Sequence, residues 1–294
     1  MREPSPRASR LVITAGIVAV AIVGGGGFLL GQRATNTRPV AAVPAPVPAV
    51  VRPAVQPEQD AGRTLGRADL IALAASAADA TAQATAMPAT VRGMIGRSFT
   101  IALPFGCAGP ATEGSDAAMR WTYDAADGVL RIHVAPLAWS PADWWSGEAP
   151  AGVEALEGFW IARPWTSSET CPAARDPVAP MGAEPVTLPG QTLAIGQIFD
   201  RESGRQGRRE GSPYTAVLRV TADAVQPGKG FRVRLTGRIV AAPDGDPVVC
   251  QQAGGAEQRP VCLVATSLDE ITIENGTTGA TLATWPAGGP TAAS

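Results

Sequence analysis

The chain has one histidine, His133, and four cysteines that form no C-x-x-C pair. Structural zinc sites use four Cys or His ligands, usually in close pairs, whereas the nearest cysteines here, Cys250 and Cys262, are 12 residues apart. The spacings of iron–sulfur and haem sites are missing as well. So are a glycine-rich phosphate loop, an H-E-x-x-H pattern, an EF-hand loop and a G-x-S-x-G elbow. We therefore expect no metal, no cofactor and no enzymatic activity.

Lysine is almost absent, because Lys229 is the only lysine among 24 basic residues. The formal net charge is −2, and lysine and arginine form no concentrated stripe along the sequence. Nucleic-acid-binding domains usually carry a basic patch on one face, so we expect no nucleic-acid partner. Scarce lysine beside abundant arginine, alanine, glycine and proline is typical of a GC-rich bacterial genome.

One long stretch lacks charge altogether. The run from Leu11 to Leu30 has 20 uncharged residues, enough to cross the hydrocarbon core of a bilayer as a helix. A cleaved signal peptide would place a small-x-small site after its apolar run, but the A-x-A at Ala19 and Ala21 lies inside the run. We therefore expect a retained, single-pass transmembrane helix over 11–30 that binds the membrane, preceded by a short cytoplasmic tail over 1–10.

The four cysteines are an even set, which favours two disulfides in an oxidising compartment. Of the three possible pairings we prefer Cys107 with Cys171 and Cys250 with Cys262, because each closes a loop within one β-rich part of the chain. In the chain-entropy model the longer loop contributes about 4 kcal/mol and the shorter about 3 kcal/mol. Disulfides predict a periplasmic domain on a bacterial inner membrane, with the N-terminus cytoplasmic. Free thiols in a cytosolic protein are the alternative.

Proline is concentrated after the apolar run. Six prolines lie between residues 38 and 58, and proline removes amide donors and favours the polyproline II conformation. We predict a semi-rigid Pro/Ala-rich linker over 31–60, which would hold the folded part away from the lipid.

Alanine then replaces proline. The segment 61–88 predicts one Ala-rich helix, with Asp69 as a possible N-cap and Pro88 as the residue that breaks it. Its apolar side consists mostly of small residues, so the helix needs to dock on the following domain or on a partner to persist.

Beyond residue 95, short segments alternate apolar and polar residues between Gly, Pro and Asn-Gly turns. This pattern predicts a mainly β fold, an antiparallel β-sandwich or barrel. The β fold consists either of two modules, 95–175 and 185–288, or of one continuous domain. A disordered tail over 289–294 is expected to follow it. The predicted strands lie near residues 99–103, 119–123, 130–134, 159–162, 192–199, 214–221, 231–240, 261–267, 271–274 and 281–285.

Aromatic residues make up only 5% of the chain, yet five of its seven tryptophans lie within 27 residues. Flat rings stack on sugar rings, and nearby carboxylates accept hydroxyl protons, so these residues form a possible ligand platform. A suitably spaced carboxylate pair would even allow glycoside hydrolysis. The alternative is that the tryptophans fill the core. The platform comprises Trp139, Trp144, Trp145, Trp160 and Trp165, and the carboxylates are Asp143, Glu148, Glu154 and Glu157.

Two other polar groups have simpler interpretations. His133 lies between Ile132 and Val134, so strand alternation places it on a solvent-facing surface with Arg131. An arginine-rich connection suits a phosphate or carboxylate ligand, or it is a solvated hairpin loop. It contains Arg201, Arg205, Arg208 and Arg209.

Anchor, linker and disulfide-linked β domain together predict a non-enzymatic envelope protein that binds another protein as an interaction or scaffold subunit. A module that binds cell-wall or surface polysaccharide is the alternative. A carboxylate-dependent hydrolase is the third hypothesis.

Overall fold

The computed structural model describes residues 62–145, 148–172, 192–201, 208–210, 212–226, 228–252, 255 and 257–287. The predicted tail 1–10, transmembrane helix 11–30, linker 31–60 and C-terminal tail 289–294 lie outside these residues. Within the described ranges, no helix has both the length and the hydrophobicity that a membrane crossing requires.

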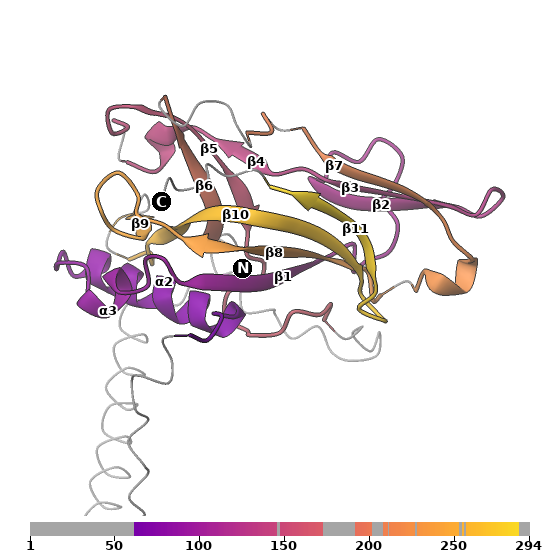
Figure 1. The fold of residues 1–294 in the computed structure, drawn as a ribbon, viewed down its shortest axis with the longest axis horizontal. Coiled ribbons are helices and arrows are strands. Elements are labelled where there is room, and N and C mark those ends of the chain that lie inside the picture. Colours follow the sequence, from indigo (N-terminus) through magenta and orange to yellow (C-terminus); the bar gives the residue numbers. More distant parts are fainter. Residues whose placement is uncertain are drawn as a thin grey trace, which may run out of the picture. The chain divides into compact units, whose positions relative to one another are not determined.

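The fold is mainly β, as the sequence predicts, and it contains two sheets (Figure 1). The larger has eight strands in the order β1-β8-β10-β6-β5-β4, with β9 and β11 also paired to β10. The smaller has the order β2-β3-β7. The strands are β1 (Ser98–Phe105), β2 (Met119–Asp124), β3 (Val129–Val134), β4 (Leu137–Trp139), β5 (Val153–Trp160), β6 (Leu193–Asp200), β7 (Tyr214–Arg219), β8 (Phe231–Ile239), β9 (Val248–Gln251), β10 (Val261–Asn275) and β11 (Thr281–Pro286).

Both β-rich stretches of the sequence contribute to both sheets. The strands β1 and β5 of the first stretch pair with β8 and β6 of the second, and β7 of the second stretch pairs with β3 of the first. From the sequence, both two modules and one continuous domain were possible. In the structure, strands of the two stretches are hydrogen-bonded to each other in both sheets.

Strand β10 connects the two halves of the large sheet. Its first residues pair with β6 and β9, and its later residues pair with β8 and β11. The register shifts between Leu268 and Glu270, where the Gln197 side chain accepts a hydrogen bond from Leu268 N–H at 2.9 Å. The β6–β10 pair is parallel, which departs from the predicted all-antiparallel sheet. Among the described strands the sheet does not close into a barrel, and β1 and β4 end its main path.

Alternating side chains give the large sheet two different faces. In β10, Cys262 and Val264 belong to the main core, while Leu263 and Ala265 belong to a second, smaller cluster on the opposite face. The main core also contains the buried side chains of β2, β3 and β7, so both sheets share it.

The free edge of β1 is covered. Leu65 forms a parallel bridge with Phe99, and the Glu169 carboxylate accepts a hydrogen bond from Ala102 N–H at 3.0 Å. Residue 104 is proline and has no N–H to cover. The Cys107–Cys171 disulfide ties the segment that carries Glu169 beside the end of β1. This edge is therefore protected against pairing with another strand.

Helix α2 (Arg67–Ala82) is the predicted Ala-rich helix, but it ends at Ala82 and not at Pro88, which instead precedes the next helix. It docks on β9, β10 and β1 of the domain that follows it. Its N-cap is Gly66, not Asp69 as predicted. Asp69 occupies the third helical position, from which its carboxylate accepts the Gly66 N–H at 2.8 Å. Because Arg67 is buried and donates to backbone carbonyls of residues 162, 163 and 166, the helix start is tied to the segment that covers β1. The short helix α3 (Ala89–Arg92) follows.

The predicted disulfides Cys107–Cys171 and Cys250–Cys262 are the two in the structure. The second directly joins opposing residues of β9 and β10. Two strands were not predicted from the sequence, β4 with three residues and β9 with four. The strand predicted near 159–162 is β5, which begins six residues earlier, at Val153. The predicted break between 267 and 271 is a bulge within the single strand β10.

Candidate functional site

Three cavities lie along α2, and residues of this helix line each of them. Alanine side chains are short, so a helix that docks through Ala74, Ala77 and Ala78 fills little space beside its backbone. The flanks of such a helix are left hollow unless large side chains from neighbouring elements fill them. The alanine-rich helix is thus the common wall of the candidate site.

The first cavity, the groove, has a volume of about 310 Å³ and lies between α2 and the beginnings of β6 and β10. Its lining is mainly apolar, with Ile71, Leu193 and Pro260 beside the alanines. Trp165 stands at this groove with 53% of its surface exposed. Arg259 also lines it and is held by an ion pair with Asp79 at 2.9 Å. An exposed tryptophan beside an apolar hollow is characteristic of a binding surface.

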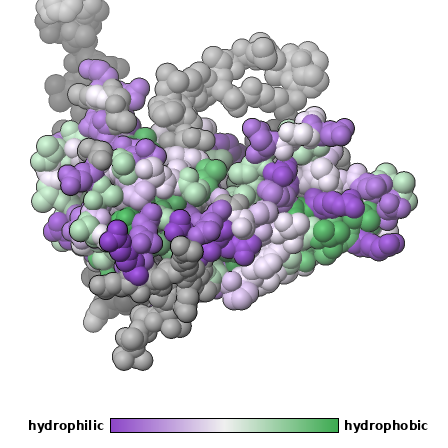
Figure 2. Space-filling model, turned by 90° about the horizontal axis from the view of Figure 1, so that it is seen from above, coloured by the Kyte–Doolittle hydropathy of each residue, from purple (hydrophilic) through white to green (hydrophobic). Residues whose placement is uncertain are grey.

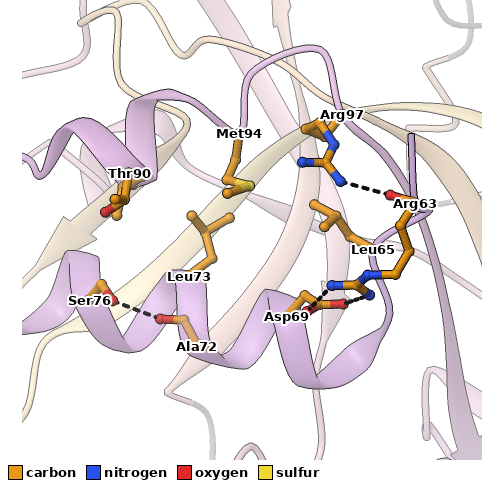
Figure 3. A pocket seen from close by; sticks show the side chains of 10 residues that line it. Arg63, Leu65, Asp69, Ala72, Leu73, Ser76, Thr90, Met94 and Arg97 are labelled. Atoms are coloured by element: carbon orange, nitrogen blue, oxygen red, sulfur yellow. Dashed lines mark hydrogen bonds and ion pairs between the residues drawn. The ribbon is translucent and has the colours of Figure 1, made fainter. Parts of the chain in front are cut away.

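The second cavity has a volume of about 290 Å³ and lies between α2 and α3. Figure 3 shows Leu65, Leu73 and Met94 directed toward one another, with polar groups around them. Arg63 forms two hydrogen bonds with the Asp69 carboxylate, at 2.8 and 2.9 Å (Figure 3). These bonds are the largest cause of the lowered pKa of Asp69, so this carboxyl stays ionised near neutral pH.

The third cavity has a volume of about 370 Å³ and lies at the C-terminal end of α2. Trp144, Trp145, Asp244 and Asp246 line it together with Thr81 and other residues. Asp246 pairs with Arg92 at 2.6 Å. Aromatic rings, carboxylates and hydroxyl groups therefore meet in one hollow.

The structure brings three of the five predicted platform tryptophans into mutual contact. The ring centroids of Trp139, Trp144 and Trp160 lie 5.4 to 5.9 Å apart, in edge or tilted arrangements. Trp144 is 3% exposed and belongs to the second core cluster. Trp145 packs against that cluster and is partly exposed, while Trp165 lies at the groove. The five residues thus occupy two different places, and Trp144 has no free ring face for a ligand.

The four carboxylates near these tryptophans do not line any of the three cavities. Glu157 is buried, and its carboxylate accepts hydrogen bonds from the backbone N–H groups of Arg209 and Glu210 at 2.8 and 2.7 Å. Glu154 forms an ion pair with Arg201 at 3.4 Å. Asp143 and Glu148 are exposed. Glu157 therefore serves to hold the loop of Arg208 and Arg209.

The arginine-rich connection is occupied by internal contacts where it is described. Arg201 pairs with Glu154, Arg208 lies 3.8 Å from Glu157, and the guanidinium of Arg209 lies 4.4 Å from the ring centre of Tyr214. Arg205 lies outside the described residues.

His133 lies on the solvent side of β3, as alternation predicts, between the buried Ile132 and Val134. Partial burial and the neighbouring charge of Arg120 lower the pKa of His133, so this imidazole is neutral at pH 7. Among the described residues, no group of His, Cys, Asp and Glu is arranged to hold a metal ion.

The residues that sequence reasoning missed are Asp244, Asp246 and Arg259, which lie in connections between strands. No local pattern marks them, because only folding brings them to the cavities beside α2. Comparisons with protein-family models, with curated proteins and with solved structures give no match.

Proposed function

We propose that this protein is a single-pass, membrane-anchored envelope protein whose β domain is a non-enzymatic interaction or scaffold subunit. The apolar run 11–30, the proline-rich segment after it and the two disulfides support this proposal. In it, the N-terminus is cytoplasmic, the β domain is periplasmic, and the partner is another envelope protein.

The observation that carries the proposal is the apolar groove with its exposed tryptophan. Tryptophan and arginine are the residues most often found at the energetic centres of protein interfaces, and Trp165 and Arg259 both line the groove. A sugar ligand needs many hydrogen-bonding partners, which this lining offers only sparsely. Apolar side chains of a partner protein suit the groove better.

Chemical crosslinking in intact cells, followed by mass spectrometry, tests the proposal with the full-length chain. We expect one recurring partner for the wild type and loss of that crosslink for Trp165→Ala, because truncation removes the exposed indole at the groove. Ile95→Ala is the matched control, since Ile95 is exposed at 41% but does not line the groove. A protein found alone under several growth conditions, or an unchanged crosslink in Trp165→Ala, contradicts the proposal.

Glycan binding is a second candidate, and the third cavity favours it. Trp145 there lies in the same hollow as Asp244, Asp246 and Thr81, a combination that suits the apolar and hydroxyl faces of a sugar. A peptidoglycan pull-down with the full-length chain tests this, with Trp145→Ala expected to reduce retention. Trp144→Ala is not suitable, because Trp144 is part of the core. Equal retention of wild type and Trp145→Ala excludes this candidate.

A further inference from the structure

The small sheet β2-β3-β7 has a second face, opposite its core residues. Strand register places three cross-strand rows on this outer face. Residues directly opposite each other in neighbouring strands point to the same side. The rows are Arg120, His133 and Thr215; Thr122, Arg131 and Val217; and Asp124, Val129 and Arg219.

An arginine stripe crosses these rows diagonally. Arg120 is on β2, Arg131 on β3 and Arg219 on β7, and each lies one row further along than the one before. Diagonal neighbours in an antiparallel sheet are about 7–8 Å apart. Arg131 and Arg219 are exposed and form no ion pair with any residue that the structure describes. Arg120 is half-buried and donates a hydrogen bond to the Ala117 carbonyl at 2.7 Å.

An apolar side chain lies beside this stripe. Val217 is 62% exposed and stands directly opposite Arg131 on the neighbouring strand. Figure 2 shows hydrophobic and hydrophilic surface side by side at the end of the molecule that carries the β2–β3 hairpin. Three cations with one acidic neighbour, Asp124, give the face an excess of positive charge. The Asp124 carboxylate already accepts backbone N–H groups of its own turn.

We propose that the arginine stripe (Arg120, Arg131 and Arg219) binds an extended acidic segment of a partner protein, with carboxylates at every second position. Alternate side chains of an extended chain lie about 6.5–7 Å apart on one side, close to the spacing of the stripe. Arginine forks suit carboxylates, and Val217 provides contact for an apolar residue of the same segment. A bare polyphosphate or a nucleic acid backbone would make no use of Val217. This surface is separate from the α2 groove and does not depend on the function assigned to it.

Fluorescence anisotropy with the full-length protein tests the inference. One labelled peptide alternates Glu with Val, and a second has the same composition with all Glu residues in one block. We expect the alternating peptide to bind more tightly, and the variant Arg120→Ala/Arg131→Ala/Arg219→Ala to bind it at least about tenfold more weakly, with binding that falls as salt rises. Arg238→Ala is the matched control, because Arg238 is an exposed strand arginine outside the small sheet.

Thermal melting of each variant shows whether the fold is kept. If the triple variant melts early, Arg131→Ala alone replaces it, with an expected loss of about threefold. Equal binding of the two peptides, equal binding by the triple variant and the control, or displacement of the peptide by polyphosphate at equal charge concentration overturns the proposal.

Discussion

The two ends of the main core are covered in different ways. At one end the cover is α2, which buries Leu70 and Leu73 near its start but only alanines from Ala74 onward, and three cavities border it. At the other end the cover is the sheet β2-β3-β7, which inserts Trp121, Leu130 and Ile132. Trp121 is 2% exposed and meets Phe231 edge to face at 5.4 Å. Large side chains fill the space at one end, and small ones leave it partly open at the other.

This difference separates two roles within one continuous core. The end covered by β2-β3-β7 buries large apolar side chains and therefore contributes stability. The end covered by α2 has cavities beside the helix, in which another molecule can place its side chains. The following changes test whether the two ends really divide the work in this way.

The largest effect is expected for Trp121→Ala. The indole is buried, and its Nε1–H donates to the Gly106 carbonyl at 3.2 Å. A Cβ at position 106 would collide with this ring, so the two residues are in close contact. Removing the ring should lower the free energy of unfolding by about 3–5 kcal/mol. Urea denaturation measures this, and a loss below about 1 kcal/mol would contradict tight packing at this end.

The next effect concerns the two disulfides. Replacing both Cys107 and Cys171 by serine opens a loop with a separation of 64 residues, whereas Cys250 and Cys262 are separated by 12. The chain-entropy model predicts losses of about 4 and about 3 kcal/mol, respectively. The first pair also ties the segment that covers the edge of β1, so its variant should aggregate more readily. Urea denaturation compares the stability of the two double variants, and light scattering compares their aggregation. Equal aggregation would mean that the segment covers the edge of β1 without the Cys107–Cys171 disulfide.

A matched pair of alanine substitutions compares the two ends directly. Ala216 is buried on the core side of β7, while Ala75 lines the groove. Ala216→Leu should overpack the core and cost about 1–3 kcal/mol. Ala75→Leu should change stability by less than about 1 kcal/mol, because its side chain enters an existing hollow. Thermal melting measures both, and the crosslink should vanish only in Ala75→Leu. Equal destabilisation would show that the groove is not open.

The smallest expected effect is a gain in stability from a substitution at the C-terminal end of α2. Ala84 has a φ of 52°, and the hydrogen bonds from Ala84 N–H to Thr81 and from Thr85 N–H to Ala80 form a Schellman motif. Glycine adopts this left-handed conformation without steric cost, so Ala84→Gly should stabilise the protein by about 0.5–1 kcal/mol. A rise in the melting temperature checks this. A fall would mean that the Ala84 side chain makes contacts worth more than the strain.

Much of the fold follows from local pattern. Alternation around Ile132 and Val134 predicted their burial and the exposure of Arg131, because the two sides of a strand face different surroundings. The alanine-rich, proline-free segment predicted α2. Strand β9 escaped prediction, since four residues carry too short a pattern. Asp69 was misassigned as the N-cap because Gly66, with no side-chain acceptor, carries no cap signal of its own.

The candidate site was much harder to predict. Trp165 was singled out for its place in a cluster along the chain, yet in space it lies at the groove, while Trp139, Trp144 and Trp160 pack on one another. Composition indicates that tryptophan is important but not whether a ring is buried, because burial depends on what the rest of the chain places over it.

The sequence by itself determined the strand-rich class, the alanine-rich helix and the number of disulfides, because these depend on local periodicity and on residue chemistry. Only the tertiary structure decided the parallel pairing of β6 with β10, the hollows beside α2 and the stripe of Arg120, Arg131 and Arg219. These features join residues that are distant in the chain. Their positions follow from the packing of whole elements against one another, a balance of many small contact energies that no short segment encodes.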